Sequence, residues 1–247
     1  MASLTAASRR NVGVVIPCLN EESAIAACVA AVLAHGVGEV IVVDGQSGDR
    51  TRELAAAAGA RVIVEPHRGY GRAMLAGMSQ LAPTSTIVLF IDGDGSDRPD
   101  RIPALLEPIE SGRAHFVLGS RLLGEREPGS LSASQIIAGY LAGFLIGLIY
   151  GVRFTDMSPF RAIRRDALDR LGMADKTFGW NLEMQMRAAA AGLRVVEIPV
   201  GQRRRAGGVS KVSGEWASAL RAAWVLVLSF WRLAWQLKRN SPPRRAL

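Results

Sequence analysis

Three aspartates follow a short apolar run, and their spacing is suited to holding a metal ion. Asp92, Asp94 and Asp97 come directly after residues 87–91, which read Ile-Val-Leu-Phe-Ile. Carboxylates two positions apart on an extended loop can share one divalent cation, and Mg²⁺ prefers one or two carboxylates together with substrate phosphates. Such a cation stabilises charge on a departing diphosphate. The alternative is a polar turn that caps the next helix, with Asp97 taking part.

The rest of the chain argues against other chemistries that use similar motifs. An EF-hand needs a Glu eleven residues after its first Asp, and that position is Pro103. An aspartate phosphohydrolase needs a downstream Lys and a second acidic pair, and no GDxxxD follows. The chain has no GxGxxG after its first apolar run and no GxxxxGK[ST], which argues against a dinucleotide-binding oxidoreductase and a P-loop NTPase.

Short runs rich in Val and Ile alternate with stretches of helical spacing over the first 120 residues. This alternation predicts βαβ units and a mostly parallel α/β sheet flanked by helices. Such sheets bind ligands beyond the carboxyl ends of their strands. The predicted strands are Val12–Ile16, Glu39–Val43, Arg61–Val64, Thr86–Ile91 and His115–Leu118, and the predicted helices are Glu22–Leu33, Arg50–Ala58, Gly71–Leu81 and Asp100–Glu110.

Polar and Gly-rich loops follow the predicted strands, so they should gather at one edge of the sheet. The first loop reads Pro-Cys-Leu-Asn-Glu-Glu from Pro17, the second begins at Asp44, and the fifth contains Arg121. Taken singly, Glu21 could be a helix N-terminal acid and Asp44 a turn cap. Their recurrence on successive loops favours a binding site. A sugar-phosphate nucleotidylyltransferase would need a Gly-rich loop with a catalytic Arg or Lys after the first strand, which this first loop lacks.

Length and charge point to one large domain with a basic tail. The chain has 247 residues and a net charge of +8, and ten Lys or Arg with one acidic residue lie between Arg203 and Leu247. The tail interleaves its charges with tryptophans and aliphatic residues, which suits an anionic lipid surface better than nucleic acid. Cys18 and Cys28 form no disulfide framework, as expected for a reducing compartment such as the cytoplasmic side of a membrane.

One apolar segment precedes the last third of the chain. Ile136–Val152 is 17 residues long, near the lower limit for spanning a bilayer. Gly139, Gly143, Gly147 and Gly151 recur every fourth residue and would form one smooth helix face that permits close packing. The segment is either a core helix or a lipid-interface helix that guides a polyprenyl chain, and its position favours the second.

A second apolar segment lies in the basic tail. Trp216–Leu237 is interrupted by Arg221 and Arg232, and tryptophans beside a basic flank indicate an interfacial helix. A single tilted transmembrane helix is the alternative, because an arginine near a helix end can extend to the lipid headgroups.

The ordered motifs resemble glycosyltransferase family 2, whose catalytic domain has the GT-A fold. The resemblance rests on VVIPCLNEE, VVDGQSGDRT, FIDGDGSD and GSR, and spans roughly residues 11–214. Three later blocks resemble dolichol-phosphate mannose synthases and bacterial polyprenyl-phosphate glycosyltransferases: DMSPFRAIRRDAL, TFGWNLEMQMRAAAAGLRVVEIPV and RRRAGGVSKVSG. The second loop departs from the pattern, since Asp-Gly-Gln-Ser stands where many relatives have Asp-Asp-Gly-Ser.

The resemblance implies a role for each matching residue. On the donor side, nucleoside contacts would come from Pro17, Asn20, Glu21 and Asp44, metal and diphosphate contacts from Asp92 and Asp94, and phosphate contacts from Arg121, Arg205 and Lys211. On the acceptor side, Arg161 would lie near the entrance, and Glu183 occupies the place where many members carry a catalytic base.

These observations predict a GT-A enzyme that performs an inverting transfer from a nucleotide diphosphate sugar, with Mg²⁺ or Mn²⁺. We expect a lipid acceptor, foremost polyprenyl phosphate, at the cytoplasmic side of the membrane. A hydroxyl of a soluble or glycan acceptor is the alternative, and a non-catalytic membrane scaffold is a third reading. We expect residues 1–10 to be disordered, 11–214 to form the catalytic domain with an apolar interface helix at 134–152, and 215–247 to form a membrane-associated amphipathic helix and basic tail.

Overall fold

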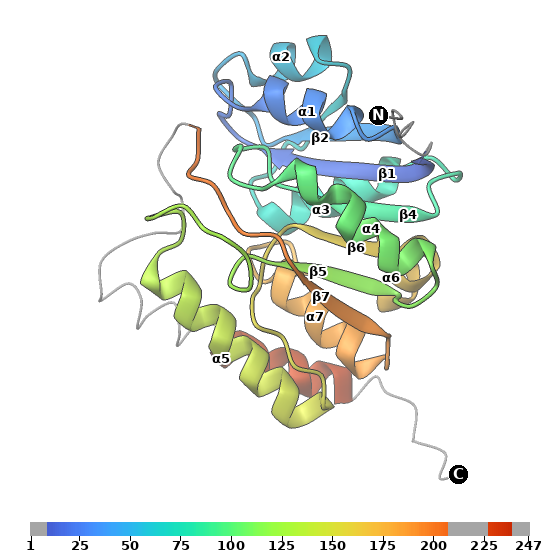
Figure 1. Ribbon diagram of the computed structural model, residues 1–247, viewed down its shortest axis with the longest axis vertical. Coiled ribbons are helices and arrows are strands. Elements are labelled where there is room, and N and C mark those ends of the chain that lie inside the picture. Colours follow the sequence, from blue (N-terminus) through green and yellow to red (C-terminus); the bar gives the residue numbers. More distant parts are fainter. Residues whose placement is uncertain (1–8, 207–226, 239–247) are drawn as a thin grey trace, which may run out of the picture.

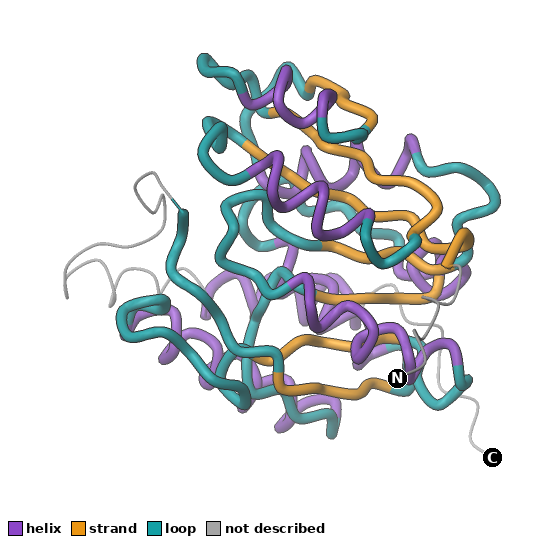
Figure 2. The backbone as a smooth tube through the Cα atoms, turned by 45° about the horizontal axis from the view of Figure 1, so that its top comes forward, coloured by secondary structure: helices purple, strands orange, loops and turns teal. Residues whose placement is uncertain are grey.

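Seven strands form a single sheet in the computed structural model, which describes residues 9–206 and 227–238. Their spatial order is β3-β2-β1-β4-β6-β5-β7, and β6 runs antiparallel to both of its neighbours while the other strands are parallel (Figures 1 and 2). The strands are β1 (Arg9–Cys18), β2 (Val37–Asp44), β3 (Arg61–Val64), β4 (Ile87–Phe90), β5 (Phe116–Ser120), β6 (Arg161–Arg164) and β7 (Val195–Pro199).

Helices cover both faces of the sheet, because parallel neighbours must be joined by crossovers. On one face, Val14 and Ile16 of β1 pack with α1, α2 and α4, and on the other Val15 packs with α3, α5, α6 and α7. Phe230, in helical residues 227–238, joins the second core. The helices are α1 (Ile25–Leu33), α2 (Thr51–Ala57), α3 (Tyr70–Gln80), η1 (Pro99–Arg101), α4 (Ile102–Glu110), α5 (Ala133–Tyr150), α6 (Arg165–Leu171) and α7 (Trp180–Ala190).

The predicted mostly parallel α/β sheet is confirmed, with shifted element ends. Strand β1 begins at Arg9, so residues 9 and 10 of the segment that we expected to be disordered belong to the sheet, while residues 1–8 lie outside the described residues. Arg9 is held there by pairing with Val37 and by a 3.0 Å ion pair from its Nε to Glu110 Oε1. Strands β6 and β7 lie beyond the region in which the pattern predicted individual strands.

Helix α5 matches the apolar helix predicted at 134–152. It starts at a capping box, in which Ser132 Oγ accepts from Gln135 N and Gln135 Oε1 accepts from Ser132 N, and it ends at Gly151 with φ of 74°. Within the described ranges it is the one helix whose length and composition would allow it to cross a membrane. Of the predicted helix at Trp216–Leu237, only residues 227–237 fall within these ranges, and Arg221 lies outside them.

Candidate active site

The loops after β1 and β2 are joined by hydrogen bonds beyond the carboxyl ends of their strands. Asn20, in the left-handed region at φ 56°, donates from its backbone to Ser47 Oγ at 2.8 Å, and Gly48 N donates to Asn20 Oδ1 at 2.9 Å. The backbone N–H of Glu21 donates to Thr51 Oγ1 at 2.8 Å. Pro17 lies buried in β1, where it pairs with Val43. These contacts hold the two loops as one unit.

Asp44 ends β2 inside this unit and is fully buried. Its Oδ2 accepts from Ser47 N at 3.0 Å and lies 3.8 Å from Arg52 Nε. Its Oδ1 is buried and has no hydrogen-bond partner among the residues that the structure describes. Buried carboxylate oxygens are almost always hydrogen-bonded, so an unmet acceptor here fits an N–H or O–H group of a ligand.

The aspartate loop after β4 is held by its own side chains. Asp94 Oδ1 accepts from the backbone and hydroxyl of Ser96 at 2.9 and 2.7 Å. Asp97 does not cap the next helix, because its Oδ2 accepts from Asp92 N at 3.0 Å. Asp92 Oδ1 accepts from the Tyr70 hydroxyl at 3.2 Å. The second oxygen of Asp97 is buried without a partner within the described part of the chain.

The electrostatics of this loop favour a cation. Burial raises the pKa of Asp92 well above its ordinary value, and the charges of Asp94 and Asp97 add to the rise. Burial also raises the pKa of Asp97 to about 7, opposed by the hydrogen bond from Asp92 N. Across residues 9–206 and 227–238, no three His, Cys, Asp or Glu side chains converge on one metal position. Mg²⁺ prefers one or two carboxylates together with phosphate oxygens. The carboxylates of Asp92 and Asp94 therefore fit a metal that is bound together with a diphosphate.

Arg205 connects the aspartate loop to the first loop. Its Nε lies 2.9 Å from Asp94 Oδ2, and its second terminal nitrogen donates to Glu21 Oε1 at 2.9 Å. The segment after β7 carries it there, since Arg203 N donates to Ser96 O and Ala206 N to Asp94 O. Figure 1 shows this segment running past the strand ends toward α1. The structure thus brings together Glu21, Asp94 and Arg205, three of the residues to which the resemblance assigned donor-side roles, and those roles stay predictions. Lys211 lies outside the described residues.

Two arginines expected to face ligands are instead engaged with the protein. Arg121 forms a bidentate ion pair with Asp156, with both contacts at 2.8 Å, and both side chains are buried. Burial alone would raise the pKa of Asp156, but the hydrogen bonds and charge of Arg121 lower it. Arg161 is 0% exposed and donates to the carbonyls of Ser158 and Asn181. The expectation that Arg161 lies at an acceptor entrance is therefore not met, because β6 directs this side chain into the core.

Glu183 is also buried, at 3% exposure, near the start of α7. Its carboxylate accepts from the backbone amides of Ala174 and Asp175 and from Arg187 Nε, which lies 2.8 Å from Oε1. A general base must reach the proton of an acceptor. Both oxygens of Glu183 already accept hydrogen bonds from the protein, so its surroundings do not match the expected base.

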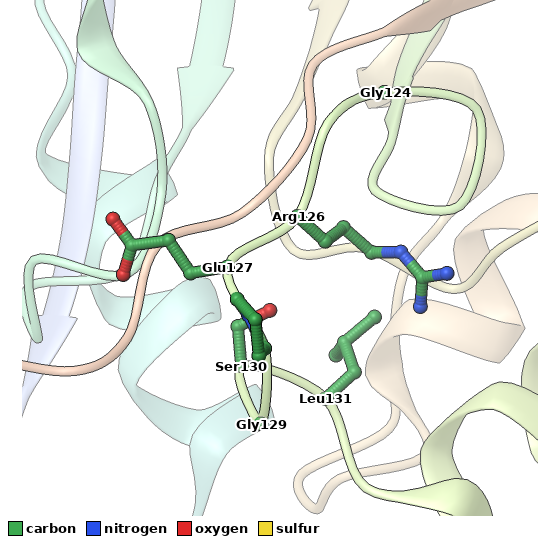
Figure 3. Close-up of a pocket in the computed structure, with 7 residues that line it drawn as sticks. Gly124, Arg126, Glu127, Gly129, Ser130 and Leu131 are labelled. Carbon is green, nitrogen blue, oxygen red and sulfur yellow. The ribbon is translucent and has the colours of Figure 1, made fainter.

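A pocket of about 320 Å³ lies in the connection between β5 and α5. In Figure 3, the side chains of Arg126 and Leu131 reach toward the same side of the loop, while Glu127 points to the opposite side. A second depression of about 390 Å³ shares Arg126 and Glu127 with Gln202. Asp92 and Asp94 line neither one, so both are distinct from the aspartate loop.

Helix α5 has an apolar face that is exposed among the residues that the structure describes. Its glycine face packs inward, where a Cβ on Gly143 would overlap the carbonyl oxygen of Phe154. Large apolar side chains elsewhere on the helix are exposed, with Phe144 67% and Leu148 71% exposed. The helical residues 227–238 lie near α5 in Figure 1 and expose further aromatic rings. The exposed large apolar residues are Ile137, Tyr140, Phe144, Leu148 and Ile149 on α5, with Leu228, Trp231 and Trp235 on residues 227–238.

Sequence reasoning missed several residues that organise the site. Tyr70 follows the third strand, and its hydroxyl donates to Asp92 Oδ1. Ser47 and Thr51 fix the first loop, and Asp156 holds Arg121. The available signals were their positions inside the motif blocks, since Ser47 and Thr51 belong to VVDGQSGDRT and Asp156 begins DMSPF.

A mostly parallel sheet flanked by helices, with two hydrogen-bonded loops and a DxD loop beyond its strand ends, defines an α/β fold with a polar site at one edge. Residues 13–172 match the family model described as Glycosyl transferase family 2, and the chain belongs to this family. It is a glycosyltransferase, and the predicted GT-A fold is confirmed.

Relatives of known sequence extend along most of the chain. An uncharacterized glycosyltransferase of Mycobacterium tuberculosis is 40% identical over 224 residues, covering 90% of this chain and 97% of the relative. A dolichyl-phosphate hexose transferase of Haloferax volcanii is 35% identical over 201 residues, covering 80% and 85%. Glucosyl-3-phosphoglycerate synthase of M. tuberculosis, solved with Mn²⁺, UDP-glucose and phosphoglyceric acid, shares the fold with a TM-score of 0.67 at 20% identity, covering 90% and 79%.

Proposed function

We propose that this enzyme transfers a sugar from a nucleotide diphosphate sugar to a lipid phosphate, foremost a polyprenyl phosphate, with inversion at the anomeric carbon. The reaction would take place at a membrane surface on the cytoplasmic side. The single observation that carries the lipid acceptor is α5, which packs its glycine face onto the domain and exposes an apolar face to its surroundings. The name of the Haloferax relative supports the same acceptor class.

The donor half of the reaction uses the joined loops and the aspartate loop. The unmet oxygen of Asp44 would accept from the nucleoside, beside the loop fixed by Asn20. Asp92 and Asp94 would hold Mg²⁺ or Mn²⁺, which when bound neutralises charge on the leaving diphosphate. Arg205, already beside Asp94, adds a second positive charge near the same group.

In the acceptor half of the reaction, the enzyme must position the acceptor phosphate, and it does not need to remove a proton from it. A lipid phosphate is an anion before it reacts, so one of its oxygens can attack the anomeric carbon from the face opposite the diphosphate without a strong base. The engagement of Glu183 with the protein is consistent with an acceptor of this kind. A hydroxyl acceptor would instead need a base with access to the acceptor proton.

The apolar face of α5 lies on the same element that packs against residues 153–156, the chain leading to the Asp156–Arg121 pair. A contiguous exposed apolar surface marks a protein or membrane interaction site. We propose that this face lies on the lipid surface and brings the headgroup of the acceptor toward the strand ends.

Product analysis by mass spectrometry tests the proposal. Purified enzyme would be incubated with a panel of nucleotide sugars and Mn²⁺ in three separate arms. The acceptor is undecaprenyl phosphate in detergent in the first arm, undecaprenol in the second, and a soluble hydroxyl compound in the third. We expect a glycosyl phospholipid only in the first arm. A product from undecaprenol or a soluble acceptor alone would move the assignment to a hydroxyl acceptor, and an absence of product in every arm would contradict the proposal.

A further inference from the structure

The buried carboxylate of Glu183 is the first member of a chain of contacts that ends at the aspartate loop. Its Oε2 accepts from Ala174 N at 3.0 Å and from Asp175 N at 2.8 Å, and Arg187 fixes its other oxygen. Hydrogen bonds that involve a charged acceptor are the stronger ones. The buried Glu183 carboxylate therefore fixes the loop between α6 and α7.

This loop in turn closes the N-terminus of α3. The first amides of a helix lack partners within the helix. Here Gly71 N donates to Thr177 O at 3.1 Å and Arg72 N donates to Lys176 O at 3.3 Å. The approach is so close that a Cβ on Gly71 would overlap the carbonyl oxygen of Asp175. The loop thus supplies backbone caps to α3 and determines where the helix begins.

The first residue of α3 is Tyr70, which reaches the aspartate loop. Its hydroxyl donates to Asp92 Oδ1 at 3.2 Å, and its ring stacks on Phe178 with centroids 6.0 Å apart. Phe178 belongs to the same loop that Glu183 holds. Both the backbone and the ring of Tyr70 are therefore located by this loop.

We infer that Glu183 is a positioning residue, which holds Tyr70 against Asp92 through residues 174–178, and that it does not remove a proton from the acceptor. The inference rests on the proposed function in taking Asp92 as a ligand of the metal–diphosphate group. Three successive hydrogen-bonded links separate Glu183 from Asp92: the carboxylate to residues 174–175, the loop to the start of α3, and the Tyr70 hydroxyl to Asp92. Its removal should loosen α3 and weaken donor binding, while any proton transfer in the reaction is left unaffected.

The test compares Glu183→Met, which removes both acceptors at similar volume, with Glu183→Gln, which keeps one acceptor oxygen. The matched control is Glu107→Met, which removes a carboxylate that is paired with Arg113 on the exposed side of α4. Hydrogen exchange of the amides of residues 71 and 72 shows whether the loop still caps α3, and this measurement needs no ligand. We call this chain of contacts from Glu183 to α3 the relay. Calorimetry with Mn²⁺ and UDP or GDP reports the donor site without turnover.

We expect Glu183→Met to speed exchange at these amides at least about tenfold and to weaken Mn²⁺–nucleotide binding roughly 3- to 30-fold, the range for one or two lost hydrogen bonds. Glu183→Gln should recover most of both, whereas a missing base would not be replaced by Gln. Tyr70→Phe should weaken Mn²⁺–nucleotide binding to a similar extent. In the double variant that also carries Glu183→Met, the affinity should fall by less than about a further twofold, because both changes act on the same contact.

Unchanged exchange and unchanged affinity in Glu183→Met, with a wild type that binds, would overturn the inference. A loss of transfer in Glu183→Gln at normal affinity would also overturn it and restore the base. If Glu183→Met is not recovered folded, Gly71→Ala breaks the relay from the α3 side and must give the same loss of affinity. A wild type that binds neither nucleotide would count against the proposed function, while the exchange result would still decide the relay.

Discussion

At the scale of single residues, Asp94 carries the metal assignment. Its Oδ1 bonds to Ser96 and its Oδ2 faces Arg205, so an Asn can keep the loop bonds while losing the charge. We expect Asp94→Asn to lower transfer roughly 10²- to 10³-fold in the presence of Mn²⁺, because charge on the leaving diphosphate is no longer compensated. Steady-state kinetics at saturating Mn²⁺ checks this, with Asp100→Asn as the control. Normal turnover in Asp94→Asn would remove the metal role.

Arg205 occupies the position of a counter-ion in the absence of ligand. Its guanidinium lies between Glu21 and Asp94, where an opposite charge stabilises the carboxylates and competes with a metal for them. We expect Arg205→Gln to tighten the binding of Mn²⁺ alone roughly 3- to 10-fold, measured by titration of the free-ion paramagnetic signal. Arg203→Gln, at a neighbouring exposed position paired with Asp100, should have no effect. Equal or weaker Mn²⁺ binding in Arg205→Gln would contradict this competition.

The sequence predicted which residues lie at the strand ends better than it predicted where their side chains point. Glu21 and Asp94 follow parallel strands and Asp44 is the last residue of one, and the carboxyl ends of these strands share one edge. Arg161 begins β6, which runs in the opposite direction, and its side chain enters the core. Spacing alone carries no sign of this reversal. The burial of Glu183 depends on a loop 8 to 9 residues earlier in the chain, which no local pattern indicates.

At the scale of elements, α5 shows how a repeated small residue can specify packing. The fourfold recurrence of glycine predicted a smooth face, and the structure packs that face against residues 153–156 of the same domain. The sequence also carries signals for both ends of the helix, because Ser132 and Gln135 have the spacing of a capping box and Gly151 lies at the C-terminal end. The sequence did not indicate the partner of the glycine face, which is an irregular segment just after the helix rather than another helix.

Two glycines on this face allow a matched test of close packing. A Cβ on Gly143 would overlap the backbone oxygen of Phe154, which can move only with its backbone segment. A Cβ on Gly147 would meet the Arg153 side chain at 3.4 Å and the Val152 carbonyl oxygen at 3.7 Å, which are ordinary contact distances. We expect Gly143→Ala to lower the free energy of unfolding by about 1–3 kcal/mol. Gly147→Ala should raise it by up to about 1 kcal/mol through helix propensity. Urea denaturation of both variants checks this, and equal stabilities would contradict the packing.

At the scale of the whole molecule, charge and apolar surface are distributed unequally. Residues 203–247 carry ten Lys or Arg and one acidic residue, a net charge of +9, whereas residues 1–202, which contain the sheet, carry 20 basic and 21 acidic residues, a net charge of −1. The exposed apolar residues of α5 and of residues 227–238 lie at the end of the molecule that carries β5 and β7, away from β3 (Figure 1). A surface of this kind suits attachment to an anionic bilayer through several weak contributions.

The membrane prediction can be tested on α5 with a control from the opposite end of the sheet. Replacing both Phe144 and Leu148 by Asp should lower partition into anionic phosphatidylglycerol vesicles at least about tenfold, because burying each side chain contributes about 1.5–3 kcal/mol. Val64→Asp, at 49% exposure on β3, should leave partition unchanged. High salt should weaken wild-type binding only in part, since it screens the charges and spares the apolar contacts. Cosedimentation measures all of these, and unchanged partition of the α5 variant would show that this helix does not contact lipid.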